Sequence, residues 1–456
     1  MRSHADVVVI GAGPAGFAAA TRAAELGAHV TLVERERLGG TCVNRGCMPA
    51  LALLKAAEVL ATIADARRHG IHVAGHTLDL ALLRERQEMQ VAALRSSMEA
   101  ALQAQEIELV PGEARLAGPN SVMVSGEQGG TITARAIILA AGATSVRPAI
   151  GGATGPGVID PEEALWVTAA PRSLAVVGAT PIGLALARIY RALGSEVTLL
   201  EEGGQVLPGE DVDVADFLAQ ELETAGVAIQ YGAQVQHIGD GPGGGRAVRI
   251  ASAAGVSELA AEKIVFAGPR RPLRYGLGLD AAGVQTAGGA IAVDDRMQTN
   301  VPGIFAAGDA IGGALLSHVA TAEGRVAAEN ALGQASRMRY KLVPRCVYTL
   351  PEAAAIGLTA EEAERGGRAV RVGLAWFASN PRAAMAGESG GLVKLVADAR
   401  FGEILGVHVI GRRAHELITT AALAMRVEAT AGDLAGLLYP HPVFGEALQE
   451  AARACR

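Results

Sequence analysis

One pattern occurs twice in this chain of 456 residues and restricts its fold more than any other feature. Residues 6–10, DVVVI, predict a buried strand, and the turn GAGPAG follows with Gly11, Gly13 and Gly16 in G-x-G-x-x-G spacing. A helical segment and a second strand, HVTLVE, then end at Glu34. In such a unit the glycines let a pyrophosphate approach the helix N-terminus, and the acid binds ribose hydroxyls. The segment therefore predicts a doubly wound, dinucleotide-binding fold.

The same pattern returns in residues 173–202, SLAVVGATPIGLALARIYRALGSEVTLLEE. Gly178 and Gly183 keep the outer glycine positions, but Thr180 occupies the middle one. The backbone normally meets the phosphate there, so the β-branched side chain leaves open a doubly wound element without a ligand. Glu201, at the end of the second strand, favours a free ribose 2′-hydroxyl and hence NAD over NADP.

Composition excludes several classes of protein. Aspartate and glutamate (47) outnumber lysine and arginine (40), whereas nonspecific nucleic-acid binding needs a basic surface. No run of ~18 uncharged apolar residues is present, so we expect no membrane span. The apolar N-terminal stretch is interrupted by glycines and Pro14, which makes it a poor signal peptide. We therefore expect a cytoplasmic protein that has no nucleic-acid or membrane partner.

The second half of the chain changes character twice. Residues 299–310, TNVPGIFAAGDA, read as an apolar strand ending at Gly308 and Asp309, and SHVATAEGRVAAENAL then has helical periodicity. After roughly residue 335, VYTLPEAAAIGLTAEEA and GLVKLVADARFGEILGVHVIG alternate like antiparallel strands, and alanine-rich helices follow. This part has no nucleotide motif and predicts a separate α+β domain.

Two cysteines lie five positions apart in GGTCVNRGCMPALALL, residues 39–54. A loop of four residues lets Cys42 and Cys47 close into a strained, exchangeable disulfide. Pro49 suits the first turn of a helix, whose N-terminus would stabilise a thiolate at Cys47. A metal site is the weaker interpretation because no second C-x-x-C or histidine pair completes four ligands. A merely structural pair is the other alternative.

Together, the two nucleotide folds, the C-x-x-x-x-C segment and the third domain resemble the flavin-dependent pyridine nucleotide-disulfide oxidoreductases over the whole chain. GGTCVNRGC matches their redox-active disulfide, TNVPGIFAAGD their second FAD motif, and HPVFGEALQEA their C-terminal acid/base motif. Among these enzymes the chain is most similar to dihydrolipoamide dehydrogenase. The resemblance implies an α/β protein with two Rossmann-like domains and a C-terminal α+β dimerisation domain. We expect the FAD-binding domain over residues 1–146 and 271–334, the NAD-binding domain over 147–270, and the dimerisation domain over 335–456.

The resemblance also implies roles for individual residues. Cys47 would face the flavin as the charge-transfer thiolate, and Cys42 would exchange with the substrate. His441 and Glu446 would form the acid/base pair, with His441 supplied by the partner subunit of a homodimer. Asp309 would contact the ribityl side of FAD. The expected FAD residues are Gly11, Gly13, Pro14, Ala15, Gly16, Glu34, Gly40, Thr41, Gly142, Gly308 and Asp309, and the expected NAD residues are Gly178, Gly183 and Glu201.

The residues support the histidine assignment independently. Glu446, five positions after His441, can hold one ring nitrogen and thereby fix the tautomer and raise the basicity of the other. The imidazole would then take a proton from a dithiol that attacks Cys42. By contrast, we expect His69, His72 and His76 to be structural or exposed at the surface.

Two positions depart from the family pattern. Dihydrolipoamide dehydrogenases carry a lysine beneath the flavin where this chain has Leu51, and a glutamate that pairs with it where this chain has Ala185. Loss of either alone would leave an uncompensated charge, so we interpret the two as one coordinated change. The expected consequences are a lower flavin potential and an altered nicotinamide pocket.

These features predict an FAD-dependent oxidation of dihydrolipoamide, on a carrier protein or as a small dithiol, with NAD+ as acceptor. The alternatives are an NAD(P)H-dependent reductase of another disulfide or of mercuric ion, and a catalytically weak flavoprotein subunit with an impaired nicotinamide site. A single C-terminal cysteine, Cys455, counts against mercury and is expected to be a free surface thiol. We expect Cys346 to lie in a strand.

Overall fold

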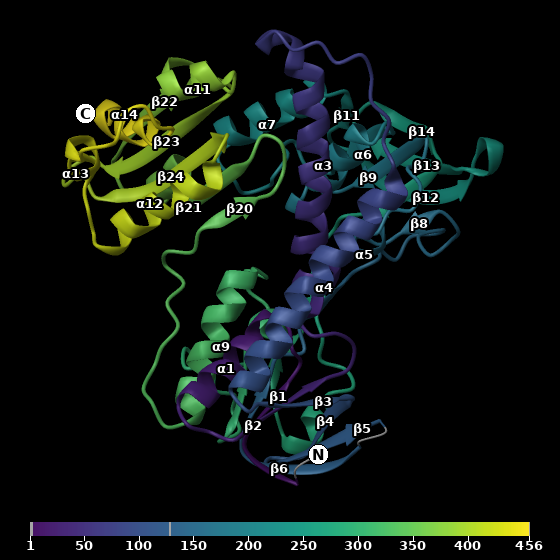
Figure 1. The fold of residues 1–456 in the computed structure, drawn as a ribbon, viewed down its shortest axis with the longest axis vertical. Helices are drawn as coiled ribbons and strands as arrows, with labels where there is room; N and C mark the ends of the chain where they lie inside the picture. Colours follow the sequence, from purple (N-terminus) through teal and green to yellow (C-terminus); the bar gives the residue numbers. More distant parts are fainter. Residues whose placement is uncertain (1–2, 127–128, 456) are drawn as a thin grey trace.

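The computed structural model describes residues 3–126 and 129–455, which form three large sheets with flanking helices (Figure 1). The first sheet has the strand order β3-β2-β1-β6-β5-β4, and β19 also pairs with β6. Its strands β1, β2, β3, β6 and β19 are parallel, whereas β4 and β5 extend it in antiparallel fashion. The bounds are β1 His4–Ile10, β2 Val30–Glu34, β3 Glu108–Pro111, β4 Glu113–Gly118, β5 Ser121–Ser125, β6 Gly130–Leu139 and β19 Ile304–Ala306.

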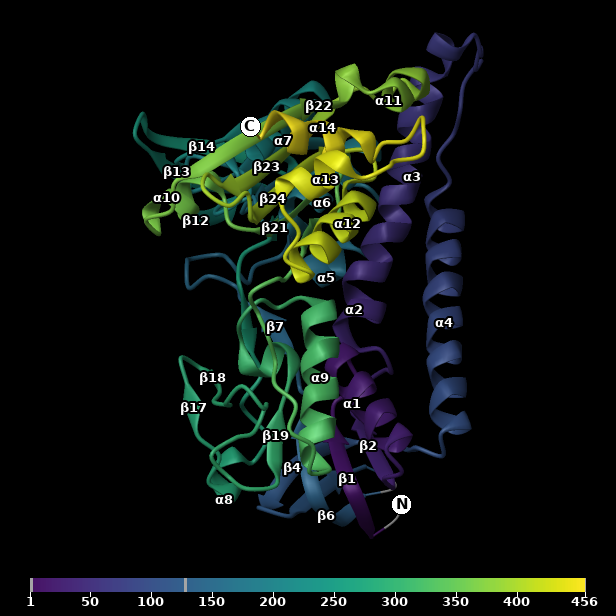
Figure 2. The ribbon, with the colours of Figure 1, turned by 90° about the vertical axis from the view of Figure 1, so that its left-hand side faces the viewer.

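Small residues allow two helices beside this sheet to pack closely against each other. The helices α1 (Pro14–Glu25) and α9 (Ser317–Ala331) lie side by side in Figures 1 and 2. A Cβ atom on Gly324 of α9 would lie 2.1 Å from the carbonyl oxygen of Ala15, so glycine is required at this crossing. Strand β1 reads as a continuous apolar run because a parallel strand is covered on both faces, and Val8 is fully buried.

The second sheet repeats the parallel arrangement, with the order β11-β10-β9-β15-β8. A three-stranded antiparallel sheet, β12-β13-β14, accompanies it. The strands are β8 Val158–Ile159, β9 Ser173–Val177, β10 Glu196–Leu200, β11 Val227–Gln230, β12 Gln234–Asp240, β13 Arg246–Ser252, β14 Gly255–Ala261 and β15 Lys263–Phe266. The helices are α5 Pro161–Ala164, α6 Pro181–Ala192 and α7 Val212–Thr224.

The third sheet is wholly antiparallel and has the order β20-β21-β24-β23-β22. Its strands are β20 Arg345–Val347, β21 Ala353–Gly357, β22 Val370–Trp376, β23 Gly391–Asp398 and β24 Ile404–Gly411. The accompanying helices are α10 Ala360–Arg365, α11 Pro381–Ala386, α12 Ala414–Arg426, α13 Ala431–Gly436 and α14 Glu446–Ala454. The predicted fold class, two Rossmann-like units and an α+β unit, is confirmed, whereas the exact domain boundaries remain predictions.

Smaller elements join these parts. They are the pairs β7 Ala143–Ser145 with β16 Arg270–Pro272 and β17 Thr286–Ala287 with β18 Ala290–Ile291, the helix α8 Leu279–Ala282, and the short 3-10 turns η1 Ala66–His69, η2 Pro242–Gly244, η3 Gly308–Ile311 and η4 Phe377–Ser379.

Two long helices, α3 (Cys47–Asp65) and α4 (Leu80–Ala104), run beside the two Rossmann-like units (Figure 2). The Gln87 side chain of α4 donates hydrogen bonds to the carbonyl oxygens of Pro49, at 3.0 Å, and Leu165, at 2.9 Å. By length and composition alone, the helical stretch Gly40–His69 could cross a membrane, with a mean hydropathy of 1.6 in its most apolar window. Core helices of soluble proteins pass the same test, so this one stretch is weak evidence of a span.

Two consecutive acidic residues form ion pairs between the Rossmann-like unit of the second sheet and the α+β unit of the third sheet. Glu210 accepts two hydrogen bonds from the Arg345 guanidinium, at 2.6 and 2.9 Å. Asp211, which is 3% exposed, lies 2.9 Å from Lys394 Nζ, and Lys394 also binds Asp213 at 2.6 Å. Lys394 and Asp211 are both buried, so removal of either one would leave an uncompensated charge between the two units.

Candidate active site

The three glycines of the first nucleotide turn are required for different reasons. A Cβ atom on Gly16 would lie 1.7 Å from the Gly11 carbonyl oxygen, and one on Gly11 would lie 2.4 Å from the Ala140 oxygen. A Cβ atom on Gly13 would meet only the Cα atom of Gly40, at 3.9 Å. Packing within the protein therefore leaves open space beside Gly13, as a cradle for a pyrophosphate requires.

The N-terminus of α1 is arranged to receive an anion. No side chain caps this helix, which begins with Pro14 and so presents its next amides toward the turn. Glu34 accepts hydrogen bonds from the amides of Ala12, at 2.7 Å, and Glu36, at 2.8 Å, which fixes its carboxylate at the end of β2. The turn, helix terminus and acid fit the adenosine diphosphate half of FAD.

The cysteine segment crosses in front of this turn. Gly40 has φ +56°, and a Cβ atom there would lie 2.7 Å from the Gly13 Cα atom, so position 40 needs glycine for the crossing. The helix α2 (Gly40–Arg45) carries Cys42, and Gly46 separates it from α3. The sequence predicted a loop of four residues between the two cysteines, and this prediction is wrong because α2 extends through most of the segment. Its residues complete a helical turn that the buried Asn44 amide stabilises by donating to the Gly40 oxygen at 2.8 Å.

Cys42 and Cys47 are half-buried free thiols that line one cavity of about 1670 Å³. Cys47 is the first residue of α3, as the sequence predicted. A hydrogen bond from Cys42 lowers the pKa of Cys47 to about 6, against the opposing effect of burial. The same bond and burial raise the pKa of Cys42 far above its usual range. At neutral pH Cys47 is therefore a thiolate and Cys42 a thiol.

Two residues that sequence reasoning missed act on Cys47. Ser317, at the start of α9, has its hydroxyl 3.7 Å from Cys47 Sγ, and this contact helps to lower the pKa of Cys47. The positive charge of Arg270 has the same direction of effect. Arg270 is held by Asp309, to which it donates at 2.6 Å. Ser317 lies 270 positions after Cys47, so no local sequence signal could have indicated the contact.

The predicted FAD residues gather around the thiols. Those that line the same cavity are Gly11, Gly13, Pro14, Ala15, Glu34, Gly40, Thr41, Gly142, Gly308 and Asp309. Gly16 is buried. The amide of Gly308 donates to the buried Glu323 at 2.8 Å, and Tyr340 donates to the other oxygen of Glu323 at 2.8 Å. The cavity therefore joins the first nucleotide turn, the thiols and the second predicted FAD motif.

An apolar wall closes another side of this cavity. Leu51 of α3 and Ala185 of α6 both line it, together with Pro181 and Ile182, and α3 packs directly against α6. Ala185 is buried and Leu51 is half-buried. The two positions that depart from the family pattern thus belong to one wall, and neither brings a charge to it.

The second nucleotide turn keeps most of this framework. A Cβ atom on Gly183 would lie 2.0 Å from the Gly178 carbonyl oxygen, so these two glycines allow the close packing of α6. Glu201 accepts from the amides of Ala179, at 2.8 Å, and Gly203, at 2.7 Å. The second turn therefore shares the glycine packing and the fixed acid of the first turn, and differs from it at Thr180.

His441 and Glu446 form the predicted pair but lie apart from the thiols. Glu446 Oε1 lies 2.9 Å from His441 Nδ1, and Oε2 accepts from the Val443 amide at 2.9 Å. The His441 side chain is 67% exposed and is absent from the residues that line the thiol cavity. Within one chain the structure does not bring His441 to Cys42 and Cys47.

The two remaining cysteines, Cys346 and Cys455, lie in different parts of the α+β unit. Cys346 lies in β20, which confirms the prediction of a strand, and burial raises its pKa to about 11. The prediction for Cys455 as a surface thiol is wrong, since it is 8% exposed. The amphipathic helix α14 packs its end against β22, where Cys455 Sγ donates to the Arg371 oxygen at 3.1 Å. As predicted, His69, His72 and His76 are exposed.

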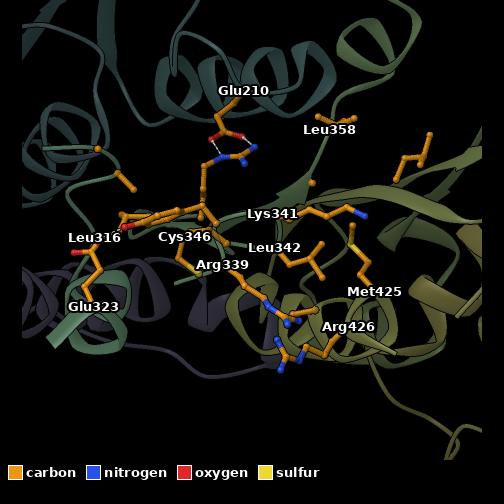
Figure 3. A pocket seen from close by; sticks show the side chains of 18 of the residues that line it. Glu210, Leu316, Glu323, Arg339, Lys341, Leu342, Cys346, Leu358, Met425 and Arg426 are labelled. Carbon is orange, nitrogen blue, oxygen red and sulfur yellow. Dashed lines mark hydrogen bonds and ion pairs between the residues drawn. The ribbon is translucent and has the colours of Figure 1, made fainter. Parts of the chain in front are cut away.

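A second cavity, of about 1740 Å³, adjoins the first. Cys346 and Leu316 line both cavities. Figure 3 shows Glu210 on one side of the second cavity, Arg339 and Arg426 on the other, and Cys346 between them.

Comparisons with known proteins agree with this geometry. A family model described as pyridine nucleotide-disulphide oxidoreductase matches residues 5–324, and the dimerisation domain of the same family matches residues 343–452. Dihydrolipoyl dehydrogenase from Thermus scotoductus is 41% identical over 453 residues, covering 98% of this chain and 97% of that protein. Dihydrolipoyl dehydrogenase from Bacillus subtilis is 36% identical over 454 residues, covering 98% and 97%.

Solved structures share the fold over the whole length. LpdA from Mycobacterium tuberculosis superposes with a TM-score of 0.90 at 28% identity, covering 99% of each chain. The Cu(II) complex of the HOCl-induced flavoprotein disulfide reductase RclA from Escherichia coli gives 0.89 at 28% identity, covering 100% of each chain. The chain thus belongs to the pyridine nucleotide-disulphide oxidoreductases and is an FAD-dependent disulfide oxidoreductase that uses NAD(H), with a C-terminal dimerisation domain.

Proposed function

We propose that this enzyme oxidises dihydrolipoamide, on a lipoyl-bearing carrier protein or as a small dithiol, with NAD+ as the final acceptor. The observation that carries the proposal is the unequal pair of thiols in the cavity that the expected FAD residues line, Cys47 with its pKa lowered to about 6 and Cys42 with its pKa raised. The dihydrolipoyl dehydrogenases at 36–41% identity support the choice of dithiol.

The unequal pKa values assign a role to each sulfur. In thiol–disulfide exchange the thiol of lower pKa leaves faster. A substrate thiolate therefore attacks Cys42 Sγ of the Cys42–Cys47 disulfide, and Cys47 leaves as a thiolate beside the Ser317 hydroxyl. The second substrate thiol then attacks the substrate sulfur of the mixed disulfide, which releases the cyclic disulfide and leaves Cys42 protonated. Bound FAD would accept the two electrons of the reduced Cys42–Cys47 pair and pass them to NAD+.

His441 supplies the base in this proposal. A carboxylate only accepts hydrogen bonds, so Glu446 requires the proton on His441 Nδ1 and leaves Nε2 free to accept one. Because His441 is exposed and remote from the thiols of its own chain, we propose that it serves the thiols of the partner subunit in a homodimer. There Nε2 takes the proton from the attacking dithiol and returns one in the reverse direction.

A metal substrate has less support. RclA was solved as a Cu(II) complex. In residues 3–126 and 129–455 of this chain no group of three or more His, Cys, Asp or Glu side chains has the spacing of a metal site. We therefore propose a dithiol as substrate, and a cytoplasmic location in keeping with four cysteines, too few for a disulfide scaffold.

An anaerobic titration of the purified flavoprotein, followed through the flavin spectrum, tests the proposal. We expect one equivalent of dihydrolipoamide to produce the long-wavelength absorbance of a thiolate next to oxidised flavin in the wild-type protein. A Cys42→Ser variant is the control, because it keeps Cys47 but cannot form the disulfide, and dihydrolipoamide should leave its spectrum unchanged. Failure of dihydrolipoamide to reduce the wild-type protein, while another dithiol does so, would reject dihydrolipoamide as the substrate.

A further inference from the structure

The two nucleotide turns of this chain have nearly the same backbone and can be compared directly. Gly13 precedes α1 with φ −71° and ψ −173°, and Thr180 precedes α6 with φ −74° and ψ 166°. Both helices begin with proline, at Pro14 and Pro181. A difference between the turns therefore comes from the side chain at the middle position rather than from the course of the chain.

The surroundings of the turns also correspond. Glu34 and Glu201 each accept from the amide of the residue after the first glycine, at 2.7 and 2.8 Å. The carbonyl oxygens of Ala12 and Ala179 each accept an amide from the loop that follows the second strand, at 2.9 and 3.0 Å. The first turn is thus an internal reference for the second.

The Thr180 side chain joins the first turn of α6 to the residue that follows β15. Its hydroxyl donates to the carbonyl oxygen of Ala267 at 2.6 Å and accepts from the amide of Gly183 at 3.3 Å. Because proline has no amide hydrogen, the first turn of α6 offers only the amides of Ile182 and Gly183 to a ligand. Thr180 already occupies one of these two, whereas no side chain caps α1.

The same side chain fills the space that the first turn leaves open. A Cβ atom on Gly13 would have only one protein atom within 4 Å, the Gly40 Cα atom, so the first turn leaves the room beside its middle position unfilled. With matching backbone angles, Thr180 places its Cβ atom in the corresponding room of the second turn. The pyrophosphate of a dinucleotide approaches the backbone most closely at this position.

From these contacts we infer that Thr180 competes with the pyrophosphate of NAD(H) for the Gly183 amide, and that it thereby makes the binding of nicotinamide dinucleotides weak. The inference rests on the proposed use of the second turn for NAD. To bind, the dinucleotide has to displace the Thr180 hydroxyl from the Gly183 amide and pass the Cβ atom of Thr180. The first turn, with Gly13, carries no such competitor for FAD.

The test is the affinity of the FAD-loaded protein for NAD+ and for ADP-ribose, measured by calorimetry on the wild type and on Thr180→Gly, Thr180→Ala and Thr180→Ser. ADP-ribose contains the pyrophosphate without the nicotinamide, so it isolates this contact. Regaining one hydrogen bond to a charged phosphate corresponds to about tenfold tighter binding or more. We expect that gain for both ligands in Thr180→Gly and a smaller one in Thr180→Ala, which keeps the Cβ atom.

The serine variant separates the hydroxyl from the methyl group. Since serine retains the capping hydroxyl, we expect Thr180→Ser to bind about as weakly as the wild type. A gain in Thr180→Ser equal to that in Thr180→Gly would overturn the capping argument. A folded, FAD-loaded Thr180→Gly protein that binds ADP-ribose no better than the wild type would overturn the whole inference. Reduction of the wild-type flavin by dihydrolipoamide does not involve this turn, so its outcome tests the proposed function separately.

Discussion

Glu446 Oε1 lies 2.9 Å from His441 Nδ1, and the other oxygen of Glu446 is held by the Val443 amide at 2.9 Å. The carboxylate is therefore fixed from two sides, and it determines which ring nitrogen carries the proton. The hydrogen bond from His441 lowers the pKa of Glu446, so this carboxyl group stays ionised throughout the range in which a histidine titrates.

His441→Gln should lower kcat with dihydrolipoamide by about 10²- to 10⁴-fold, the usual contribution of a positioned general base. Flavin content should be unaffected because His441 does not line the thiol cavity of its own chain. Glu446→Gln should give a smaller loss, since the amide still holds the ring but no longer favours one tautomer. Steady-state kinetics against pH check both variants. Equal kcat for His441→Gln and wild type would contradict the base assignment.

The Cys42–Cys47 hydrogen bond predicts how the reduced enzyme responds to pH. A pKa lowered to about 6 keeps Cys47 ionised above that pH and lets it protonate below it, so the thiolate–flavin absorbance should disappear as pH falls through 6. Cys42→Ser keeps a hydrogen-bond donor and should titrate at a similar pH. Cys42→Ala removes the donor and should titrate higher. Identical titrations of the serine and alanine variants would show that Cys42 does not stabilise the thiolate.

Ser317→Ala should also raise the pKa of Cys47, because the hydroxyl 3.7 Å from its sulfur helps to stabilise the thiolate. The effect should be smaller than that of Cys42→Ala, whose hydrogen bond is the larger cause. Spectral pH titration of Cys42→Ser with and without Ser317→Ala measures the shift directly. Ser317→Thr, which keeps the hydroxyl, is the matched control and should titrate like serine.

The apolar wall of Leu51 and Ala185 predicts the effect of returning a charge. Leu51→Lys should raise the flavin potential, because a cation near the cavity favours the reduced, anionic flavin. Each 1.4 kcal/mol of such stabilisation corresponds to about 30 mV for a two-electron couple. Adding Ala185→Glu should reverse part of the rise, since the glutamate neutralises the lysine. Leu51→Met, which adds length but no charge, is the control, and a rise of the same size in that variant would exclude electrostatics as the cause.

The buried ion pairs between units predict a stability effect. Lys394→Met leaves Asp211 without its cation and should lower the free energy of unfolding by about 3–5 kcal/mol. Lys341→Met is the matched control, because this exposed lysine lies 4.0 Å from Glu403, and such pairs contribute roughly 0–1 kcal/mol. Denaturant unfolding of the FAD-loaded protein measures both. Equal values for the two variants would show that the buried pair does not hold the units together.

Local sequence patterns were sufficient for most of the architecture. The first strand predicted from DVVVI corresponds to β1, and the predicted helix from Ser317 corresponds to α9, because buried parallel strands and alanine-rich helices each have a distinct residue pattern. The helical turn of α2 was missed because GTCVNR is too short to show a period. Its conformation depends on Asn44, whose amide bonds are visible only in the fold.

The site was predicted less completely than the fold. Motif spacing located Cys42, Cys47, His441 and Glu446, whereas Ser317 reaches Cys47 only through the packing of α9 against the first sheet. The sequence indicated that the β-branched Thr180 stands where backbone normally meets phosphate, but not that its hydroxyl caps α6, because the Ala267 oxygen reaches Thr180 only in the fold. Cys455 was misplaced because a position near the chain end says nothing about which strand covers it.

The distance of His441 from the thiols of its own chain has a consequence for mixtures of defective chains. In our proposal each catalytic centre is assembled from two polypeptides, so Cys42→Ser and His441→Gln chains are both inactive as pure dimers. A mixed dimer of the two holds one centre with both defects and one with neither. Co-expression of two dead alleles should thus restore activity, up to about half of the wild-type value in each mixed dimer. Two such mutations in the same gene would therefore complement each other when both alleles are expressed, although each alone abolishes activity.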